Sequence, residues 1–234
     1  MRAFVDEGAR VAALVRTPDQ IAEVELPLES GGICVSADIT DEAACRAAVR
    51  ECEQRLGACD VLVNAAGIAV SAKFVDTDAK TWRRVIATDL DGPYNLTRSV
   101  LPAMLARGSG AVISIASTAG LKGAPYVAAY TAAKHGLVGL MRALAAEYAS
   151  SGVTFNSVCP GYVDTPMTER TLENIMQKTG RSRDAALQAL LVTQGRLIAP
   201  EEVAAVCLML ASDAGRSTNG EAIIVESRLR AEDC

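Results

Sequence analysis

The sequence predicts an α/β protein built on a doubly wound parallel sheet, and three observations support this fold class. Apolar runs of strand length alternate with stretches of helical periodicity along the chain. The connections are long enough to hold the helical crossovers that parallel strands need. Of the 234 residues, 50% are apolar and 22% are charged, so a sizeable core can form. Because we find no linker, repeat or low-complexity segment, we expect residues 1–234 to form one domain.

The expected elements alternate in order along the chain. Short apolar runs predict strands at residues 10–15, 32–36, 60–64, 111–116, 153–158 and 221–226. Apolar residues at helical spacing predict helices at 41–56, 80–107, 130–150, 168–191 and 201–211. Gly57 is placed to end the first helix, and Gly92-Pro93 to bend the second. A doubly wound sheet binds its ligands at the carboxyl ends of its strands.

Charge and composition exclude several classes of function. A net charge of −5 and a pI near 5.1 argue against nucleic acid or an anionic membrane as the main partner. No run reaches the roughly 18 apolar residues of a membrane span. Asp6 and Glu7 interrupt any signal-peptide core, so a cytoplasmic protein is expected. Because His135 is the only histidine and the seven cysteines include no C-x-x-C pair, we expect no metal site.

Tyr130 and Lys134 are the sharpest candidates for chemistry. Residues four apart lie on one face of a helix, and a lysine cation there favours the phenolate of a tyrosine whose ordinary pKa is about 10. Such a pair is common by chance, but its context is specific. Ser117 lies upstream, where an apolar strand ends; alone, it would be interpreted as a hydroxyl that satisfies a nearby backbone group. Asn64-Ala65-Ala66-Gly67 ends the preceding strand, and Pro160-Gly161 the following one.

These motifs resemble those of the short-chain dehydrogenase/reductase family. The matching pieces are N-A-A-G at 64–67, the serine at 117, Y-x-x-x-K at 130–134 and P-G-x-x-x-T at 160–165, within a similarity that spans about 8–225. The resemblance implies a Rossmann-type domain in which hydride passes between a nicotinamide dinucleotide and a carbonyl or secondary alcohol. It further implies that Tyr130 exchanges the proton, that Ser117 holds the substrate oxygen, and that Lys134 binds the nicotinamide ribose and depresses the pKa of Tyr130.

The resemblance also implies the cofactor-binding residues. They are Arg16, Asp38, Asn64, Ala65, Gly67, Tyr130, Lys134, Pro160, Gly161, Val163 and Thr165. Val15 stands where NAD-preferring relatives tend to carry an acid, and Arg16 could meet a 2′-phosphate. NADP(H) is therefore favoured, with NAD(H) as the alternative; Arg16 would then be an ordinary surface residue.

The chain departs from the family at its start. The family's first strand and its T-G-x-x-x-G-x-G turn precede a helix that ends like residues 4–9, and Met1 falls inside that helix. No other glycine-rich phosphate loop follows a later strand. We therefore expect a sheet that lacks its usual first strand, with the two neighbouring strands exposed or forced together, in a truncated or mis-started version of a longer protein. The alternative is a genuine short variant that is catalytically impaired or silent and acts by binding or as a subunit.

Asp89 is the second departure. The family usually places an asparagine in the segment 88–92, where it bridges by water to the catalytic lysine. An aspartate there would pair with Lys134 and offset its effect on Tyr130. We therefore group Asp89 with the catalytic residues and expect Tyr130 to be less acidic than in an asparagine version. The alternative is that Asp89 continues a helix on a solvated face.

The segment 167–197 resembles the mobile substrate lid of the family. It carries four cations that could meet the phosphate of a carrier- or CoA-bound acyl chain, or could belong to a solvated polar helix: Arg170, Lys178, Arg181 and Arg183. The stretch 158–167 is similar to that of 3-oxoacyl and polyketide ketoreductases and 3-hydroxyacyl dehydrogenases. A 3-oxoacyl or 3-hydroxyacyl thioester is therefore the expected substrate. Relatives assemble through the helices that match 80–107 and 130–150, so we expect a homodimer or homotetramer.

Overall fold

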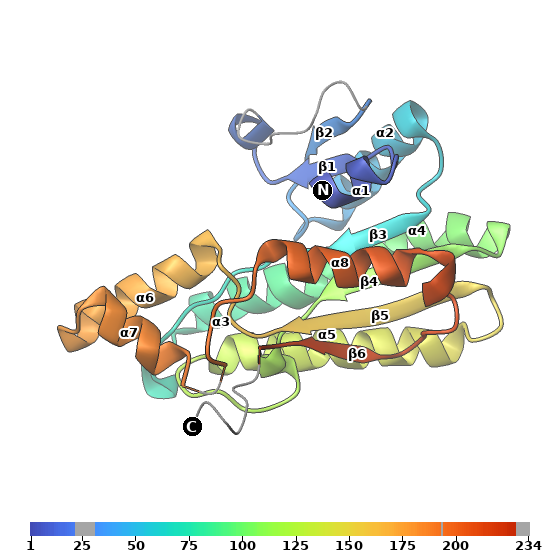
Figure 1. Ribbon diagram of the computed structural model, residues 1–234. Helices are drawn as coiled ribbons and strands as arrows, with labels where there is room; N and C mark the ends of the chain where they lie inside the picture. The colour runs from blue at the N-terminus through green and yellow to red at the C-terminus, as the bar shows by residue number, and fades with distance from the viewer. Residues whose placement is uncertain (22–30, 193, 228–234) are drawn as a thin grey trace.

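The computed structural model describes residues 1–21, 31–192 and 194–227, and its named strands form two parallel sheets (Figure 1). Strand β1 (Ala12–Val15) pairs with β2 (Ile33–Ser36). The second sheet has the order β3 (Val61–Asn64), β4 (Gly110–Ile115), β5 (Val153–Pro160) and β6 (Ala222–Val225). Each ladder is parallel, which confirms the predicted α/β class.

Strands β1 and β3 are edge strands of separate sheets and do not pair with each other. For a sheet without the family's first strand, the expected outcomes were two exposed neighbours or two neighbours forced together. The described strands match the first outcome. An edge strand leaves half of its backbone groups without ladder partners, so β1 and β3 each have one unpaired side.

Helices cover both faces of the larger sheet. Helices α4 (Gly92–Arg107) and α5 (Ala128–Glu147) pack on one face, and α8 (Pro200–Ala211) packs on the other beside α1 (Arg2–Asp6). Helix α2 (Glu42–Leu56) contacts both β1 and β2 and also packs on α4, so it joins the two sheets. The main apolar core lies between the larger sheet and the α4/α5 layer, and a smaller one lies under α8.

Local chemistry sets both ends of α2, and the end at Gly57 was predicted. The Asp41 carboxylate accepts hydrogen bonds from the N–H groups of Ala43 and Ala44, at 2.8 and 3.1 Å. The helix ends at Gly57, whose φ of +88° is a conformation that favours glycine. These two residues account for the helix from either end.

The helix expected at 80–107 is interrupted. It begins as α3 (Ala79–Ile86), widens into a π-helical turn at Ala87–Asp91, and continues as α4. The widening lies just before Gly92-Pro93, where a bend was expected. Pro93 has no N–H to donate, and the Gly92 N–H instead reaches back to the Ala87 carbonyl.

The polar stretch expected as one helix at 168–191 forms two. Helix α6 (Pro166–Thr179) ends at Gly180, whose φ is +68°, and α7 (Arg183–Leu190) begins after the Ser182 cap. Arg183 donates two hydrogen bonds to the Glu169 carboxylate, at 3.0 and 2.8 Å, and so joins α7 to α6. Within the described residues, no helix combines the length and apolarity needed to cross a membrane.

Replacing Phe155 with alanine should lower the free energy of unfolding by about 3–5 kcal/mol, because the ring is fully buried in β5 and its loss leaves a cavity. Urea unfolding followed by circular dichroism measures this change. The matched control is Phe74→Ala, whose ring is exposed and whose removal should change stability by no more than about 0.5 kcal/mol. Equal effects of the two variants would contradict this account of the core.

Candidate active site

Ser117, Tyr130 and Lys134 lie together at the carboxyl end of β4. Ser117 follows the strand, and its hydroxyl accepts a hydrogen bond of 3.1 Å from the Ala119 N–H. The same hydroxyl is hydrogen-bonded to the phenol of Tyr130, in the first turn of α5. Lys134 lies one turn further along α5, with its Nζ 5.5 Å from the centre of the Tyr130 ring. The structure therefore brings these three predicted residues together.

Lys134 forms a buried ion pair with Asp89. Lys134 Nζ lies 3.3 Å from Asp89 Oδ2, and the two side chains are 4% and 0% exposed. Lys134 also donates a 2.9 Å hydrogen bond to the Ile115 carbonyl at the end of β4. The other carboxylate oxygen, Asp89 Oδ1, accepts one of 2.9 Å from the Ile68 N–H after β3. Asp89 is thus no part of a solvated helix face, and that alternative is wrong.

The π-helical turn at Ala87–Asp91 belongs to the construction of this pair. Asp89 is the middle residue of the turn and is the buried one. A π turn places one more residue between hydrogen-bonded partners than an α turn, so it shifts the face on which the following side chains lie. The turn packs against α5, which carries Lys134. The irregular turn thus accompanies an inward-facing carboxylate.

Burial dominates the ionisation of the site. It raises the pKa of Tyr130 to about 12; the Ser117 hydrogen bond opposes this increase, and the Asp89 carboxylate adds to it. Burial also lowers the pKa of Lys134, although Asp89 opposes the change. For Asp89, burial raises the pKa against the opposing charge of Lys134. The lowering of the Tyr130 pKa that was expected from Lys134 does not prevail, because burial of the phenol raises this pKa and the Asp89 carboxylate adds to the increase.

The turn after β3 packs closely on the ion pair. A Cβ on Gly67 would lie 2.9 Å from Asp89 Oδ2 and 3.4 Å from Lys134 Nζ, so only glycine allows the backbone to approach the pair this closely. Ala65 is exposed beside it. Asn64 is buried and donates to Ser114 at 3.2 Å, but its Oδ1 has no hydrogen-bond partner in the structure.

Gln194 is a structural residue of the site that the sequence did not reveal. Its Oε1 accepts a 2.7 Å hydrogen bond from the Tyr162 N–H, and its Nε2 donates one of 2.8 Å to the Tyr162 carbonyl. A Cβ on Gly161 would collide with this amide. Gln194 therefore fixes the turn after Pro160, from a position far along the chain. A glutamine in a polar segment carries no sequence signal of such a contact.

The remaining predicted cofactor residues lie at two places. Val163 forms a bridge with Ile198, and Thr165 stands at the N-terminus of α6, with its hydroxyl 3.3 Å from the Val163 carbonyl. Arg16 and Asp38 lie instead at the carboxyl end of the small β1/β2 sheet, and both are exposed. Hydrogen bonds from Thr40 lower the pKa of Asp38, with a smaller contribution from Arg16. Arg16 and Asp38 therefore lie on a different sheet from the one at whose edge Ser117, Tyr130 and Lys134 lie.

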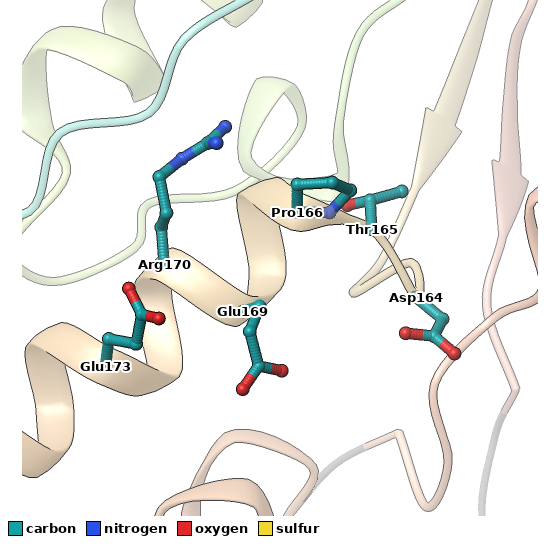
Figure 2. A pocket seen from close by; sticks show the side chains of 6 residues that line it. All are labelled: Asp164, Thr165, Pro166, Glu169, Arg170 and Glu173. Carbon is teal, nitrogen blue, oxygen red and sulfur yellow. The ribbon is translucent and has the colours of Figure 1, made fainter. Parts of the chain in front are cut away.

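The expected lid offers fewer free cations than its sequence indicated. Arg183 is held by Glu169, and Lys178 donates a 3.0 Å hydrogen bond to the Ser71 carbonyl. A pocket at the start of α6 is lined by three acids, one cation and two uncharged residues: Asp164, Thr165, Pro166, Glu169, Arg170 and Glu173 (Figure 2). Figure 2 shows Arg170 pointing away from Glu169. Because Glu169 is paired with Arg183, Asp164, Glu173 and Arg170 set the remaining charge, which is net negative and does not favour a phosphate there. Residue 193 of this segment lies outside the described residues.

In the part of the chain that the structure describes, no three His, Cys, Asp or Glu side chains lie close enough together to hold a metal ion. What the site does present is a phenol, a hydroxyl and an ammonium at the strand ends of a parallel sheet. That arrangement is typical of an oxidoreductase that relies on a dinucleotide for the redox step.

Comparisons with known proteins agree with this class. The family model described as enoyl-(acyl carrier protein) reductase matches residues 1–227. The putative ketoacyl reductase 1 of the granaticin polyketide synthase from Streptomyces violaceoruber is 36% identical over 225 residues, covering 93% of this chain and 83% of that protein. D-beta-hydroxybutyrate dehydrogenase of Cupriavidus necator is 33% identical, covering 94% of this chain and 87% of the enzyme.

A solved structure is similar over nearly the whole chain. It is the crystal structure of a point variant of the actinorhodin polyketide ketoreductase with NADPH, with a TM-score of 0.91 and 32% identity, covering 97% of this chain and 89% of that one. The chain therefore belongs to the short-chain dehydrogenase/reductase family, and it is an NAD(P)-dependent oxidoreductase.

Replacing Asp89 with asparagine should lower the pKa of Tyr130 by at least about one unit, because the change removes a nearby negative charge and leaves the Lys134 cation unbalanced. Phenolate absorbance, followed from pH 8 to about 12 in the parent protein and in the variant, measures the ionisation of Tyr130. Subtracting the titration of the same protein with Tyr130→Phe removes the other tyrosines. An equal pKa of Tyr130 in the parent protein and in the Asp89→Asn variant would contradict the electrostatic coupling.

Proposed function

We propose that this protein reduces the keto group of a 3-oxoacyl thioester with NADPH, and oxidises the corresponding 3-hydroxyacyl compound in reverse. The observation that carries the proposal is the hydrogen-bonded Ser117–Tyr130 pair above Lys134. The ketoacyl reductase and hydroxybutyrate dehydrogenase names of two relatives support a 3-oxo or 3-hydroxy acyl substrate.

Each catalytic residue has a distinct role in this proposal. Tyr130 donates a proton to the carbonyl oxygen, and its pKa of about 12 keeps the phenol protonated at neutral pH. The Ser117 hydroxyl holds the same oxygen next to the phenol. Lys134 binds the ribose hydroxyls, and Asp89 positions the Lys134 side chain. A bound nicotinamide dinucleotide supplies the hydride. A protonated phenol at neutral pH suits the reductive direction.

The proposed cofactor site joins the two sheets. Asn64, Ala65 and Gly67 would line the ribose and nicotinamide portion, together with the segment that holds Pro160, Gly161, Val163 and Thr165. Asp38 would accept from the adenine, and Arg16 would meet the 2′-phosphate that distinguishes NADP(H) from NAD(H). NADPH in the similar ketoreductase structure supports this choice.

Assembly and the alternative function follow from the same observations. We propose a homodimer or homotetramer formed through α4 and α5, and Tyr94 on α4 is an exposed aromatic residue suited to such a contact.

A catalytically silent binding or subunit protein is not favoured, because Ser117, Tyr130 and Lys134 converge as reductase chemistry requires. The cations Lys178 and Arg183 already have partners, so recognition of a carrier phosphate by these two residues is not favoured either.

Replacing Tyr130 with phenylalanine tests the proposed function. The variant should lose about 10²–10⁴-fold in kcat for NADPH-dependent reduction of 3-oxobutyryl thioesters, because the proton donor is gone while the ring remains. NADPH oxidation followed by absorbance gives the rate. The matched control Tyr148→Phe, at the C-terminal end of α5, should keep the parental rate. An unchanged rate in the Tyr130 variant, or no reduction of any ketone by the parent, would overturn the proposal.

Replacing Arg16 with aspartate should weaken NADPH binding by about tenfold or more and leave NADH binding unchanged or stronger, because the substitution puts a negative charge where the 2′-phosphate is expected. Fluorescence titration with each dinucleotide gives the two dissociation constants. Arg50→Asp, an exposed change of the same charge on α2, is the control and should alter neither constant. Equal NADPH affinity before and after the Arg16 change would refute the assignment.

A further inference from the structure

Tyr126 holds a backbone conformation that its side chain disfavours. Its φ is +68°, and it is the one non-glycine residue with a positive φ among residues 1–21, 31–192 and 194–227. It follows Pro125 in a turn. A turn of this kind places proline first and selects glycine or asparagine second, because a Cβ crowds the backbone when φ is positive. The chain keeps a tyrosine there nonetheless.

Packing does not explain this choice. The Tyr126 side chain is 59% exposed, so its ring contributes little to the core. The residue immediately precedes Val127, the cap of α5, and stands four positions before Tyr130. It lies on the segment that connects Ser117 to α5. A strained and exposed aromatic residue beside a catalytic group is a candidate for contact with a ligand.

Two hydrogen bonds join this segment to the loops around it. The Tyr126 carbonyl accepts a 2.8 Å bond from the Ala72 N–H, in the connection after β3. Lys178, on α6, donates a 3.0 Å bond to the carbonyl of the adjacent Ser71. The connections after β3, β4 and β5 therefore meet at one edge of the sheet. This is the edge at which the catalytic side chains lie.

The same edge carries further exposed apolar side chains. Phe74 and Val75 follow Ala72 closely and are 72% and 85% exposed. We name Phe74, Val75 and Tyr126 the apolar rim. Such a surface is a poor match for the phosphates and ribose groups of a dinucleotide, but it suits a hydrocarbon chain. The flanking residues of the loop, Lys73 and Asp76, carry opposite charges, so the loop offers no net positive charge to a phosphate.

We infer that Tyr126 is a specificity-determining residue, which with Phe74 and Val75 binds the apolar acyl tail of the substrate beyond its reacting carbonyl. The inference rests on the proposed function and deepens it by naming the part of the substrate that the rim selects. Tyr126 is not one of the three residues assigned to the carbonyl, so the inference assigns it to the more distant part of the acyl chain. Its contribution grows with chain length, because each added methylene buries more apolar surface.

A series of 3-oxoacyl thioesters with four to twelve acyl carbons tests this inference on the full chain. Tyr126→Gly should raise KM for the longest substrates about tenfold and leave the four-carbon rate within about twofold, since only long tails lose contact area. Tyr126→Phe keeps the ring and should retain the parental preference. Met209→Ala, an exposed apolar change on α8, is the control and should leave the preference unchanged.

Stability separates recognition from a structural role. Because glycine adopts a φ of +68° without steric strain, the melting temperature of Tyr126→Gly should be unchanged or higher. A lower melting temperature with equal losses on all substrates would overturn the inference, as would an unchanged chain-length preference. These outcomes differ from failure of the proposed function, in which the parent protein reduces no thioester of the series.

Discussion

The buried Asp89–Lys134 ion pair is the interaction on which the rest of the site depends. Removing two charges from water is costly unless their remaining hydrogen-bonding groups are satisfied. Here Lys134 Nζ also binds the Ile115 carbonyl, and Asp89 accepts from the Ile68 N–H. Together the pair ties the end of β4, the loop after β3, the π-helical turn and α5 to one another. A change in any of these segments would leave a charge buried without its partner.

Burial dominates the acid–base character of Tyr130, and the Asp89 carboxylate of the same pair adds to its effect. An unbalanced lysine beside a phenol would favour the phenolate, which is the base needed to oxidise an alcohol. With Asp89 present, the neighbouring charge is nearly neutral, and burial of the phenol becomes the dominant effect. The protonated form then prevails at neutral pH, and that form is the acid needed to reduce a carbonyl. The Asp89 carboxylate thus adds to the effect of burial and favours the protonated phenol.

Much of the fold and site followed from local patterns in the sequence. Apolar runs placed the strands, and Gly57 placed the end of α2, because a glycine stop acts within a few residues. The four-residue spacing placed Tyr130 and Lys134 on one face. The π turn was not predicted, because hydrogen-bond register leaves no mark on apolar periodicity. Gln194 was missed because its contact with Tyr162 spans distant parts of the chain. Gly180 divides the segment expected as one helix at 168–191, because its positive φ ends α6.

The places where this chain breaks local rules gather at one edge of the larger sheet. There Asn64 has an unpartnered buried oxygen, Asp89 is a buried charge in an irregular turn, and Tyr126 holds a positive φ. Each feature costs folding free energy, and none improves the apolar core. Foldable sequences tend to satisfy local preferences everywhere except where function competes. Since three independent violations occur at the strand ends where the Ser117 hydroxyl meets the Tyr130 phenol, selection for ligand binding and catalysis explains their shared location better than chance does.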